Sequence, residues 1–360
     1  MIRRLQALRF VAAALVLVGH TFMEAVQHGL ALGSAERLTR LPWGVGVDVF
    51  FVISGFIIAT ASLDKPRGGE SVIDFLAHRL IRVWPTYAFF TALMLAAVLL
   101  VPSFLRHATL SVSHTLASFV FLPWPRPGDG HLYPLLGQGW TLNYEMFFYL
   151  AFAAVLFLPA RRRVPALVLS GIALIALGQF ATLPPWLTFY SRPVIAEFLF
   201  GVLLSVAYRR FAPPPWFGFA LIAAAVAFLA IVPIDTEVEW RSIGAGLPAA
   251  ALVAGTLFSG MPGERLLGSR LLVLLGDASY ALYLCHTFVV NAVLWLLLKL
   301  LGHAPTALFF FTAVVGSLIA SVVTYWLVEQ PFLRLLKPRY RALRARVPGR
   351  DARSGVAPLS

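Results

Sequence analysis

The first apolar segment of the chain contains two ionisable residues that it would not be expected to tolerate. Arg9 and His20 are separated by ten uncharged, almost entirely hydrophobic residues in the run Arg9-Phe-Val-Ala-Ala-Ala-Leu-Val-Leu-Val-Gly-His20. Ionisable groups inside a bilayer are costly, and they usually face a protein interior or a water-filled cavity. A neutral imidazole is also well suited to act as a general base towards a hydroxyl group. His20 is therefore the first candidate for a catalytic residue.

Three further ionisable residues are expected at the depth of His20. A helix rises about 1.5 Å per residue, which brings four groups from four different segments to the outer third of a ~30 Å hydrocarbon core: His20, Asp48, Glu145 and His286. Each alone could be a polar residue that merely joins two helices. Four at one depth, with Trp140, Asn143 and Tyr144 beside them, favour a polar cavity. Glu197 could belong to this cavity or only line its mouth.

Two chemical roles are open to His20. As a general base, it would have its tautomer fixed by Asp48 or Glu145, in the way that a carboxylate orients the histidine of a catalytic triad. As a nucleophile, it would attack a carbonyl group itself and form an acyl-imidazole. The sequence does not separate these two routes.

A pair of arginines lies near the other surface of the membrane. Arg79 and Arg82 are three residues apart, and so share one helical face, directly before Trp84-Pro85. Paired guanidinium groups suit bidentate capture of phosphate, although arginines at the inner end of a helix also satisfy the positive-inside rule without binding anything. Arg9 lies low in its segment, nearer to this pair than to His20. We therefore assign it to the same phosphate-binding group.

Composition identifies the class of protein. The chain of 360 residues is 59% hydrophobic and 12% charged, with a mean hydropathy of +0.82, whereas about 25% of residues are charged in a soluble domain. The net charge of +13 is dispersed over loop ends and a tail, which excludes a nucleic-acid-binding face. The single Cys285 excludes a disulfide framework and a thiolate metal cluster.

Ten membrane spans are predicted from runs of about 20 apolar residues. They cover approximately 5–23, 44–63, 84–102, 139–159, 164–183, 193–208, 215–233, 243–260, 272–298 and 307–328. The segment 109–123 is too short for a span and is expected to be a re-entrant or interfacial helix. All but seven of the 29 Lys and Arg residues then fall on the side of the amino terminus, which predicts that both termini are cytoplasmic.

The predicted architecture is an all-α polytopic bundle without a separate soluble domain. Residues 1–335 form the membrane domain, and 336–360 form a basic cytoplasmic tail that we expect to be disordered. The outer segment 103–138 carries His107, His114 and His131, but no ligand spacing links them, so they are interpreted as solvated loop histidines and no metal site is predicted. Small residues such as Gly46, Ser54 and Gly55 would allow close helix approach or passage of a substrate.

Six blocks in order resemble the acyltransferase-3 family of integral membrane acyltransferases, which includes bacterial polysaccharide and lipopolysaccharide O-acetylases. The resemblance covers about residues 5–335. Its blocks are Arg9 with His20, Gly46-Val-Asp-Val-Phe-Phe-Val-Ile-Ser-Gly55, Arg79-Leu-Ile-Arg-Val-Trp-Pro85, Gly139-Trp-Thr-Leu-Asn-Tyr-Glu-Met-Phe-Phe-Tyr149, Gly276-Asp-Ala-Ser-Tyr-Ala-Leu-Tyr-Leu-Cys-His286 and Val328-Glu-Gln-Pro331.

The resemblance implies transfer of an acyl group, usually acetyl, from cytoplasmic acyl-CoA to a hydroxyl of a cell-envelope or extracellular glycan at the outer face of a bacterial inner membrane. It implies that His20 is essential, that Arg9 is its partner in the first block, and that Arg79 and Arg82 bind the phosphates of CoA. Expected acceptor contacts are Ser54, Trp140, Asn143 and Tyr280. Some relatives carry a soluble esterase-like domain, so a later acyl relay here would use a separate periplasmic partner.

A transporter is the main rival interpretation, because intramembrane Asp, Glu and His residues also build proton relays. A repeat-built transporter should show paired interrupted helices in its two halves, and none is evident in the sequence. A membrane scaffold would fit the predicted fold but would leave the layer of ionisable residues around His20 unexplained.

Overall fold

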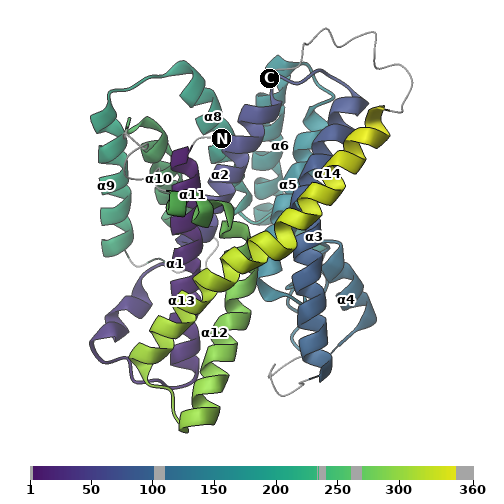
Figure 1. The fold of residues 1–360 in the computed structure, drawn as a ribbon. Coiled ribbons are helices and arrows are strands. Elements are labelled where there is room, and N and C mark those ends of the chain that lie inside the picture. The colour runs from purple at the N-terminus through teal and green to yellow at the C-terminus, as the bar shows by residue number, and fades with distance from the viewer. Residues whose placement is uncertain (1–2, 101–109, 233, 235–240, 261–269, 346–360) are drawn as a thin grey trace.

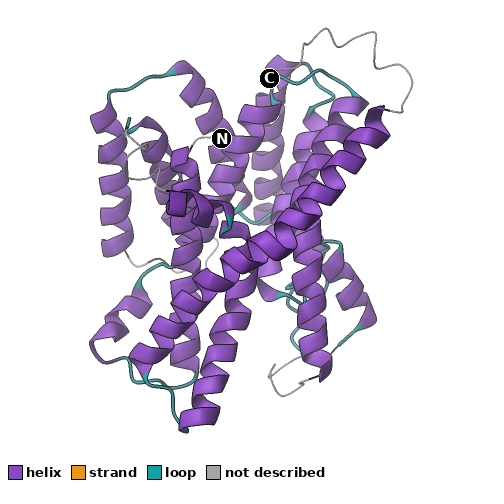
Figure 2. Ribbon diagram, in the orientation of Figure 1, coloured by secondary structure: helices purple, strands orange, loops and turns teal. Residues whose placement is uncertain are grey.

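The computed structural model describes residues 3–100, 110–232, 234, 241–260 and 270–345. Every regular element in these ranges is a helix, and none of them contains a strand (Figure 2). This confirms the predicted all-α class. The long hydrophobic runs satisfy their backbone hydrogen bonds within each segment, which is what a chain inside hydrocarbon requires.

The described helices succeed one another along the chain. In chain order they are α1 (Arg3–Gln27), η1 (Gly33–Arg40), α2 (Val45–Ser62), α3 (Gly69–Leu100), α4 (Val112–Phe119), η3 (Gly137–Gly139), α5 (Trp140–Val155), α6 (Ala160–Phe180), α7 (Pro185–Tyr190), α8 (Ile195–Arg210), α9 (Pro215–Ile231), the π-helical turn η4 (Ser242–Gly246), α10 (Leu247–Phe258), α11 (Arg270–Asp277), α12 (Ser279–Leu301), α13 (Thr306–Thr324), the π-helical turn η5 (Tyr325–Glu329) and α14 (Gln330–Ala345).

Each of the ten predicted spans coincides with a helix. Within the described residues, seven helical stretches are long and apolar enough to cross a membrane, namely 3–27, 33–62, 69–100, 160–180, 185–210, 279–301 and 306–345. The helices 215–231 and 242–258 are shorter apolar segments, and α5 has 16 residues. The short helix α4 has only eight residues, about 12 Å, so the segment 109–123 does not add a span where it is described.

Helix α2 is the centre of the bundle. It packs against α1, α8 and α10, and most of its residues are buried. Gly55 of α2 and Gly201 of α8 lie directly against the backbone of the opposite helix, so that a Cβ atom at either position would overlap it. Gly46 is in the same position against Ala12 of α1. Small residues therefore bring α1, α2 and α8 into backbone contact, as predicted from their spacing.

The other helices flank this centre on two sides (Figure 1). Helices α9 and α10 lie together on one side, and α3 and α4 lie on the opposite side. Helices α13 and α14 run on continuously through η5 and cross the front of the bundle diagonally, so that α14 ends on the same side as the first turn of α1. We call this side the N-terminal side and the opposite one the far side.

Two predictions about the polar segments were wrong. The first ten residues of the predicted disordered tail, 336–345, are helical in α14, because Arg344 and Tyr340 bond to Asp74 of α3 and Leu333 is buried; residues 346–360 lie outside the described residues. His114 is not solvated but buried, with its Nε2 atom 2.8 Å from the carbonyl oxygen of Tyr133. His131 is exposed as expected, and His107 lies outside the described residues.

Arg163 illustrates how the bundle uses a buried charge for structure. It is only 1% exposed, and its guanidinium donates to the carbonyl oxygens of Leu63, Lys65, Leu156 and Leu158. These carbonyls follow the ends of α2 and α5, where carbonyl groups have no N–H donors from their own helix. Arg163 therefore ties two helix ends together.

Replacing Arg163 by Ala should destabilise the folded protein by about 2 kcal/mol or more, since several buried carbonyl groups lose their donors. Thermal unfolding of the purified protein in detergent measures this as a lowered midpoint. The neighbouring exposed Arg162→Ala is the control and should unfold at the wild-type temperature. Equal midpoints for the two variants would contradict this role.

Candidate active site

His20 and His286 meet in the interior of the bundle. His20 comes from α1, and His286 from α12, where it is 1% exposed. The Nδ1 atom of His20 lies 2.7 Å from Nε2 of His286, and the two rings stack with centroids 4.9 Å apart. The structure thus joins two of the predicted catalytic residues directly, although they are far apart in the sequence.

The partners of the two rings fix their tautomers. Nδ1 of His286 lies 3.0 Å from the carbonyl oxygen of Leu282, which can only accept, so this nitrogen carries a proton. In the neutral ring, Nε2 of His286 is then an acceptor for the proton on Nδ1 of His20. The remaining nitrogen, Nε2 of His20, carries the lone pair. The chain Leu282–His286–His20 therefore presents one unprotonated nitrogen for chemistry.

Tyr283 sets the position of α12 against α5. Its hydroxyl donates to the carbonyl oxygen of Gln138 at 3.1 Å and lies 3.0 Å from the hydroxyl of Thr141. Gln138 in turn donates to the carbonyl oxygen of Leu284 at 3.0 Å. His286 lies one turn after Tyr283 on the same helix, so these bonds also hold the histidine in place.

Asp48 lies nearer the N-terminal side than His20, because it follows Gly46 of α2, which packs against Ala12, eight residues before His20 on α1. Its carboxylate accepts two hydrogen bonds from the guanidinium group of Arg241, from Nε at 3.1 Å and from Nη2 at 2.9 Å. Arg241 also lies over the ring of Trp140, 5.9 Å from its centroid. Asp48 is completely buried, and its carboxylate bonds to Arg241 instead of fixing the tautomer of His20.

Glu197 faces the same ion pair from α8. It is completely buried, and its charge interacts with those of Asp48 and Arg241. Neither of its carboxylate oxygens has a hydrogen bond of good geometry to any described residue. Glu197 therefore joins the interior polar cluster instead of lining its mouth.

Glu145 lies deeper than predicted. Helix α5 begins inside the bundle, because the preceding segment folds inward and buries Leu136, Gln138 and Gly139. The Thr141–Tyr283 contact fixes the register of α5 against α12, which run in opposite directions. Glu145 is one turn beyond Thr141 towards the N-terminal side, and His286 is one turn from Tyr283 towards the far side. About 10 Å of helix therefore separates the levels of Glu145 and His286.

The partners of Glu145 confirm this depth. Its Oε1 atom accepts from Ser54 at 3.1 Å and from Tyr149 at 2.5 Å. Ser54 lies six residues, about 9 Å, beyond Asp48 along α2. The prediction of one layer is thus correct for His20 and His286 and wrong for Asp48 and Glu145, which lie on the N-terminal side of the histidines.

The predicted arginines gather on the N-terminal side of Glu145. Arg82 forms an ion pair with Glu329 of η5 at 2.5 Å, and the charge of Arg9 interacts with those of Arg82, Glu329 and Glu145. Arg79 lies over the rings of Phe75 and Tyr149, 5.6 and 5.8 Å from their centroids. Arg9 lies eleven residues before His20 on α1, about 16 Å along the axis. Arg9, Arg79 and Arg82 therefore lie together on the N-terminal side of the histidines.

The predicted acceptor contacts lie in different environments. Trp140 packs edge-on against Phe51 and Tyr144 near Arg241. Asn143 is completely buried, and neither atom of its amide bonds to a described residue. Ser54 bonds to Glu145. Tyr280 donates to the carbonyl oxygen of Val83 at 2.8 Å, which fastens α12 to α3 near the arginines.

Sequence reasoning missed three residues of this site. Arg241 was counted as an outer topological charge, and no signal in the sequence connects it to Asp48. Tyr283 and Glu329 stand inside two of the quoted blocks, where a polar residue in an apolar run could have identified them. Among the described residues, no group of three or more His, Cys, Asp or Glu side chains could hold a metal ion.

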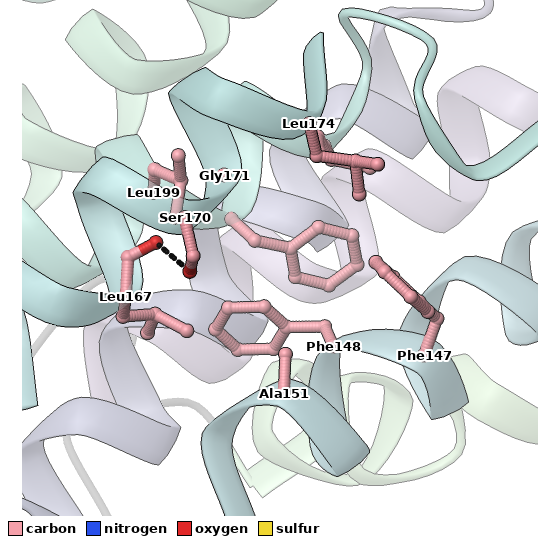
Figure 3. Close-up of a pocket in the computed structure, with 10 residues that line it drawn as sticks. Phe147, Phe148, Ala151, Leu167, Ser170, Gly171, Leu174 and Leu199 are labelled. Carbon is pink, nitrogen blue, oxygen red and sulfur yellow. Dashed lines mark hydrogen bonds between the residues drawn. The ribbon is translucent and has the colours of Figure 1, made fainter. Parts of the chain in front are cut away.

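An apolar cleft lies apart from these polar groups. It has a volume of about 220 Å³ between α5, α6 and α8, and its lining includes Phe147, Phe148, Leu167 and Ser170 (Figure 3). The hydroxyl of Ser170 donates a hydrogen bond to the carbonyl oxygen of Leu167 at 3.1 Å. The cleft therefore offers packing surface but no catalytic group, and the histidine pair is the better candidate for the reaction centre.

Comparison with known proteins agrees with the geometry. An acyltransferase domain family matches residues 2–326. The chain belongs to the acyltransferase-3 family. Its relatives include the exopolysaccharide production protein ExoZ of Rhizobium meliloti (strain 1021), 36% identical over 85% of this chain and 94% of that protein. Acyltransferase MdmB of Streptomyces mycarofaciens is 28% identical over 96% and 95% of the two chains, and nodulation protein 10 of Rhizobium leguminosarum bv. viciae 25% identical over 91% and 92%.

Membership of this family makes the protein an acyl-transferring enzyme, as predicted from the six blocks. No solved structure matches the chain. The apolar helices and the family together make it an integral membrane protein.

The tautomer chain yields a testable difference between two substitutions of His286. His286→Gln keeps a side-chain oxygen that can accept the proton on Nδ1 of His20, whereas His286→Leu has no acceptor. We expect acyl transfer in isolated membranes to fall about 100-fold in the Leu variant and by clearly less in the Gln variant, in line with the usual effect of general-base alignment. Equal activities at equal protein levels would contradict the assignment.

Proposed function

We propose that the protein transfers an acyl group, in the simplest case acetyl, from cytoplasmic acyl-CoA to a hydroxyl of a cell-envelope or extracellular glycan. The observation that carries this proposal is the hydrogen-bonded chain from Leu282 through His286 to His20, from which we infer that Nε2 of His20 carries a lone pair. The glycan acceptor is supported by the similarity to a protein of exopolysaccharide production. The N-terminal side of the bundle would face the cytoplasm, in accordance with the positive-inside rule.

In the general-base route, Nε2 of His20 removes the proton of a sugar hydroxyl as its oxygen attacks the thioester carbonyl. The carbon–sulfur bond then breaks, and the proton passes from His20 to the departing thiolate, so that the ester and a free thiol are formed. His286 stabilises the imidazolium by accepting the hydrogen bond from Nδ1, and Leu282 holds His286 in the accepting tautomer.

In the acyl-histidine route, Nε2 of His20 attacks the thioester and the thiolate leaves first. The intermediate is an acyl-imidazolium, because Nδ1 keeps its proton. The sugar hydroxyl attacks its acyl carbon, the bond from that carbon to Nε2 breaks, the hydroxyl proton passes to the thiolate, and the neutral ring is restored. The same free lone pair serves both routes. They differ in whether an acylated His20 exists in the absence of an acceptor.

The donor path would begin at Arg79 and Arg82. Guanidinium pairs bind phosphate oxygens bidentately, and Arg9 adds a third cation on the path to His20. The distance of about 16 Å from Arg9 to His20 suits an extended donor whose phosphates stay on one side while its thioester reaches the histidines. Glu145, Ser54 and Tyr149 would line the way between these levels.

His20→Ala should abolish acylation, because no other described group takes over the lone pair at this position. Membranes are incubated with labelled acetyl-CoA, and surface glycans from variant and wild-type cells are compared by mass spectrometry. Label that appears in glycan with the wild type alone supports the proposal. Unchanged glycan acylation in the variant would overturn it, and substrate flux without acyl transfer would favour a transporter.

Trapping experiments separate the two routes. Acyl label on His20 after a single turnover without acceptor supports the acyl-histidine route, and its absence under those conditions supports the general-base route.

Arg82→Ala should weaken binding of CoA by about tenfold or more, since it removes one guanidinium and its charge-assisted hydrogen bonds. Titration of the purified protein in nanodiscs with CoA measures the dissociation constant. Arg67→Ala, an exposed arginine beyond the end of α2, is the matched control and should bind like the wild type. Unchanged affinity in Arg82→Ala would refute the donor site.

A further inference from the structure

Glu329 accepts a hydrogen bond from Arg82, the arginine on which the proposed donor site depends. Its Oε1 lies 2.5 Å from Nη1 of Arg82, and the carboxylate is completely buried. The other oxygen, Oε2, has no hydrogen bond to any described residue. The side chain of Arg82 remains 32% exposed, so a ligand can approach the guanidinium from its open side.

The local backbone holds Glu329 in this position. It is the last residue of the π-helical turn η5, between α13 and α14. A π turn changes the direction in which the following side chains point, and such turns are frequent at functional sites. Beyond it, α14 is fastened to α3, because Nε of Arg344 donates to Asp74 at 2.9 Å and Tyr340 donates to the same carboxylate at 2.5 Å. The Glu329–Arg82 pair thus lies between two fixed helices.

Arg9 is a second possible partner for the carboxylate of Glu329. The charge of Arg9 interacts with that of Glu329, and Nε of Arg9 is buried without a hydrogen-bond partner in the described chain. A buried carboxylate that leaves one arginine must find another partner, because an unpaired buried charge is strongly destabilising. Movement of Glu329 from Arg82 towards Arg9 would keep each charge compensated.

We propose that Glu329 is an internal competitor for the donor. In the donor-free enzyme it pairs with Arg82, and a phosphate group of the donor displaces it towards Arg9. A phosphate has three oxygens and more negative charge than a carboxylate, so it is the stronger partner for the fork of Arg82. Release of the product CoA lets Glu329 return. This inference rests on the proposed donor site at Arg79 and Arg82.

The competing explanation is a purely structural ion pair. In that case Glu329 only compensates Arg82, and its loss destabilises the protein without improving donor binding. The two explanations predict opposite effects of Glu329→Gln on affinity, because the amide has nearly the same shape but no charge with which to compete.

The test is titration of the full-length protein in nanodiscs with CoA, together with thermal unfolding with and without it. Glu329→Gln should bind CoA about tenfold more tightly, equal to about 1.4 kcal/mol, with slower dissociation. It should unfold at a lower temperature without CoA and gain more than the wild type when CoA is added. Asp64→Asn, which breaks the 2.5 Å Arg209–Asp64 pair, is the matched control and should leave affinity unchanged.

The variants separate failure of this inference from failure of the donor site. If Arg82→Ala loses CoA binding but Glu329→Gln binds no more tightly than the wild type, the competition is refuted and the donor site stands. If Arg82→Ala binds normally, the donor site itself is refuted, and the inference falls with it. Should Glu329→Gln not fold, Glu329→Asp decides: it keeps the charge with a shorter reach, and it should bind CoA more tightly than the wild type.

Discussion

The high cost of ionisable groups inside an apolar bundle governs this structure. An unpaired charge in such surroundings costs several kcal/mol or more, so buried charges are held by partners from other helices. Asp48 with Arg241, and Arg82 with Glu329, each join two segments distant in sequence. The polar pairs therefore fix the arrangement of the helices as well as the chemistry, and the lone pair of His20 is available because every other atom of its hydrogen-bonded chain is already used.

These pairs are arranged in levels along the bundle. The histidines lie towards the far side. The Asp48–Arg241 pair, Glu145 and the predicted arginines Arg9, Arg79 and Arg82 lie nearer the N-terminal side. A substrate that carries charge at one end and a reactive thioester at the other matches this order. The arrangement explains how one bundle could present a donor from one compartment to an acceptor in the other without a large movement of helices.

Much of the fold follows from the sequence because the bilayer restricts the choices. About 20 apolar residues in a row form a helix in hydrocarbon, and each of the ten predicted spans contains one. The site was predicted less completely. The sequence places His20 and His286 together by depth alone, and this prediction is correct although the predicted span of His286 is broken at Ala278. Glu145 was misplaced because the segment before α5 folds into the bundle, and counting residues from an assumed membrane surface then starts at the wrong level.

Partners between distant segments were the least predictable feature. Apolar periodicity shows which residues lie in a helix, but not which way a side chain points where the helix is irregular. Arg241 directly precedes the π turn η4, and Glu329 ends the π turn η5. Asp277 ends α11, immediately before the break at Ala278 that separates it from α12, and it accepts a hydrogen bond from Gln6 of α1. A regular helix turns about 100° per residue, so a local change of pitch is needed to aim a side chain at a partner off that pattern. Arg241, Glu329 and Asp277 each lie beside an irregular turn. The irregular backbone directs these side chains towards partners that a regular helix would not have faced.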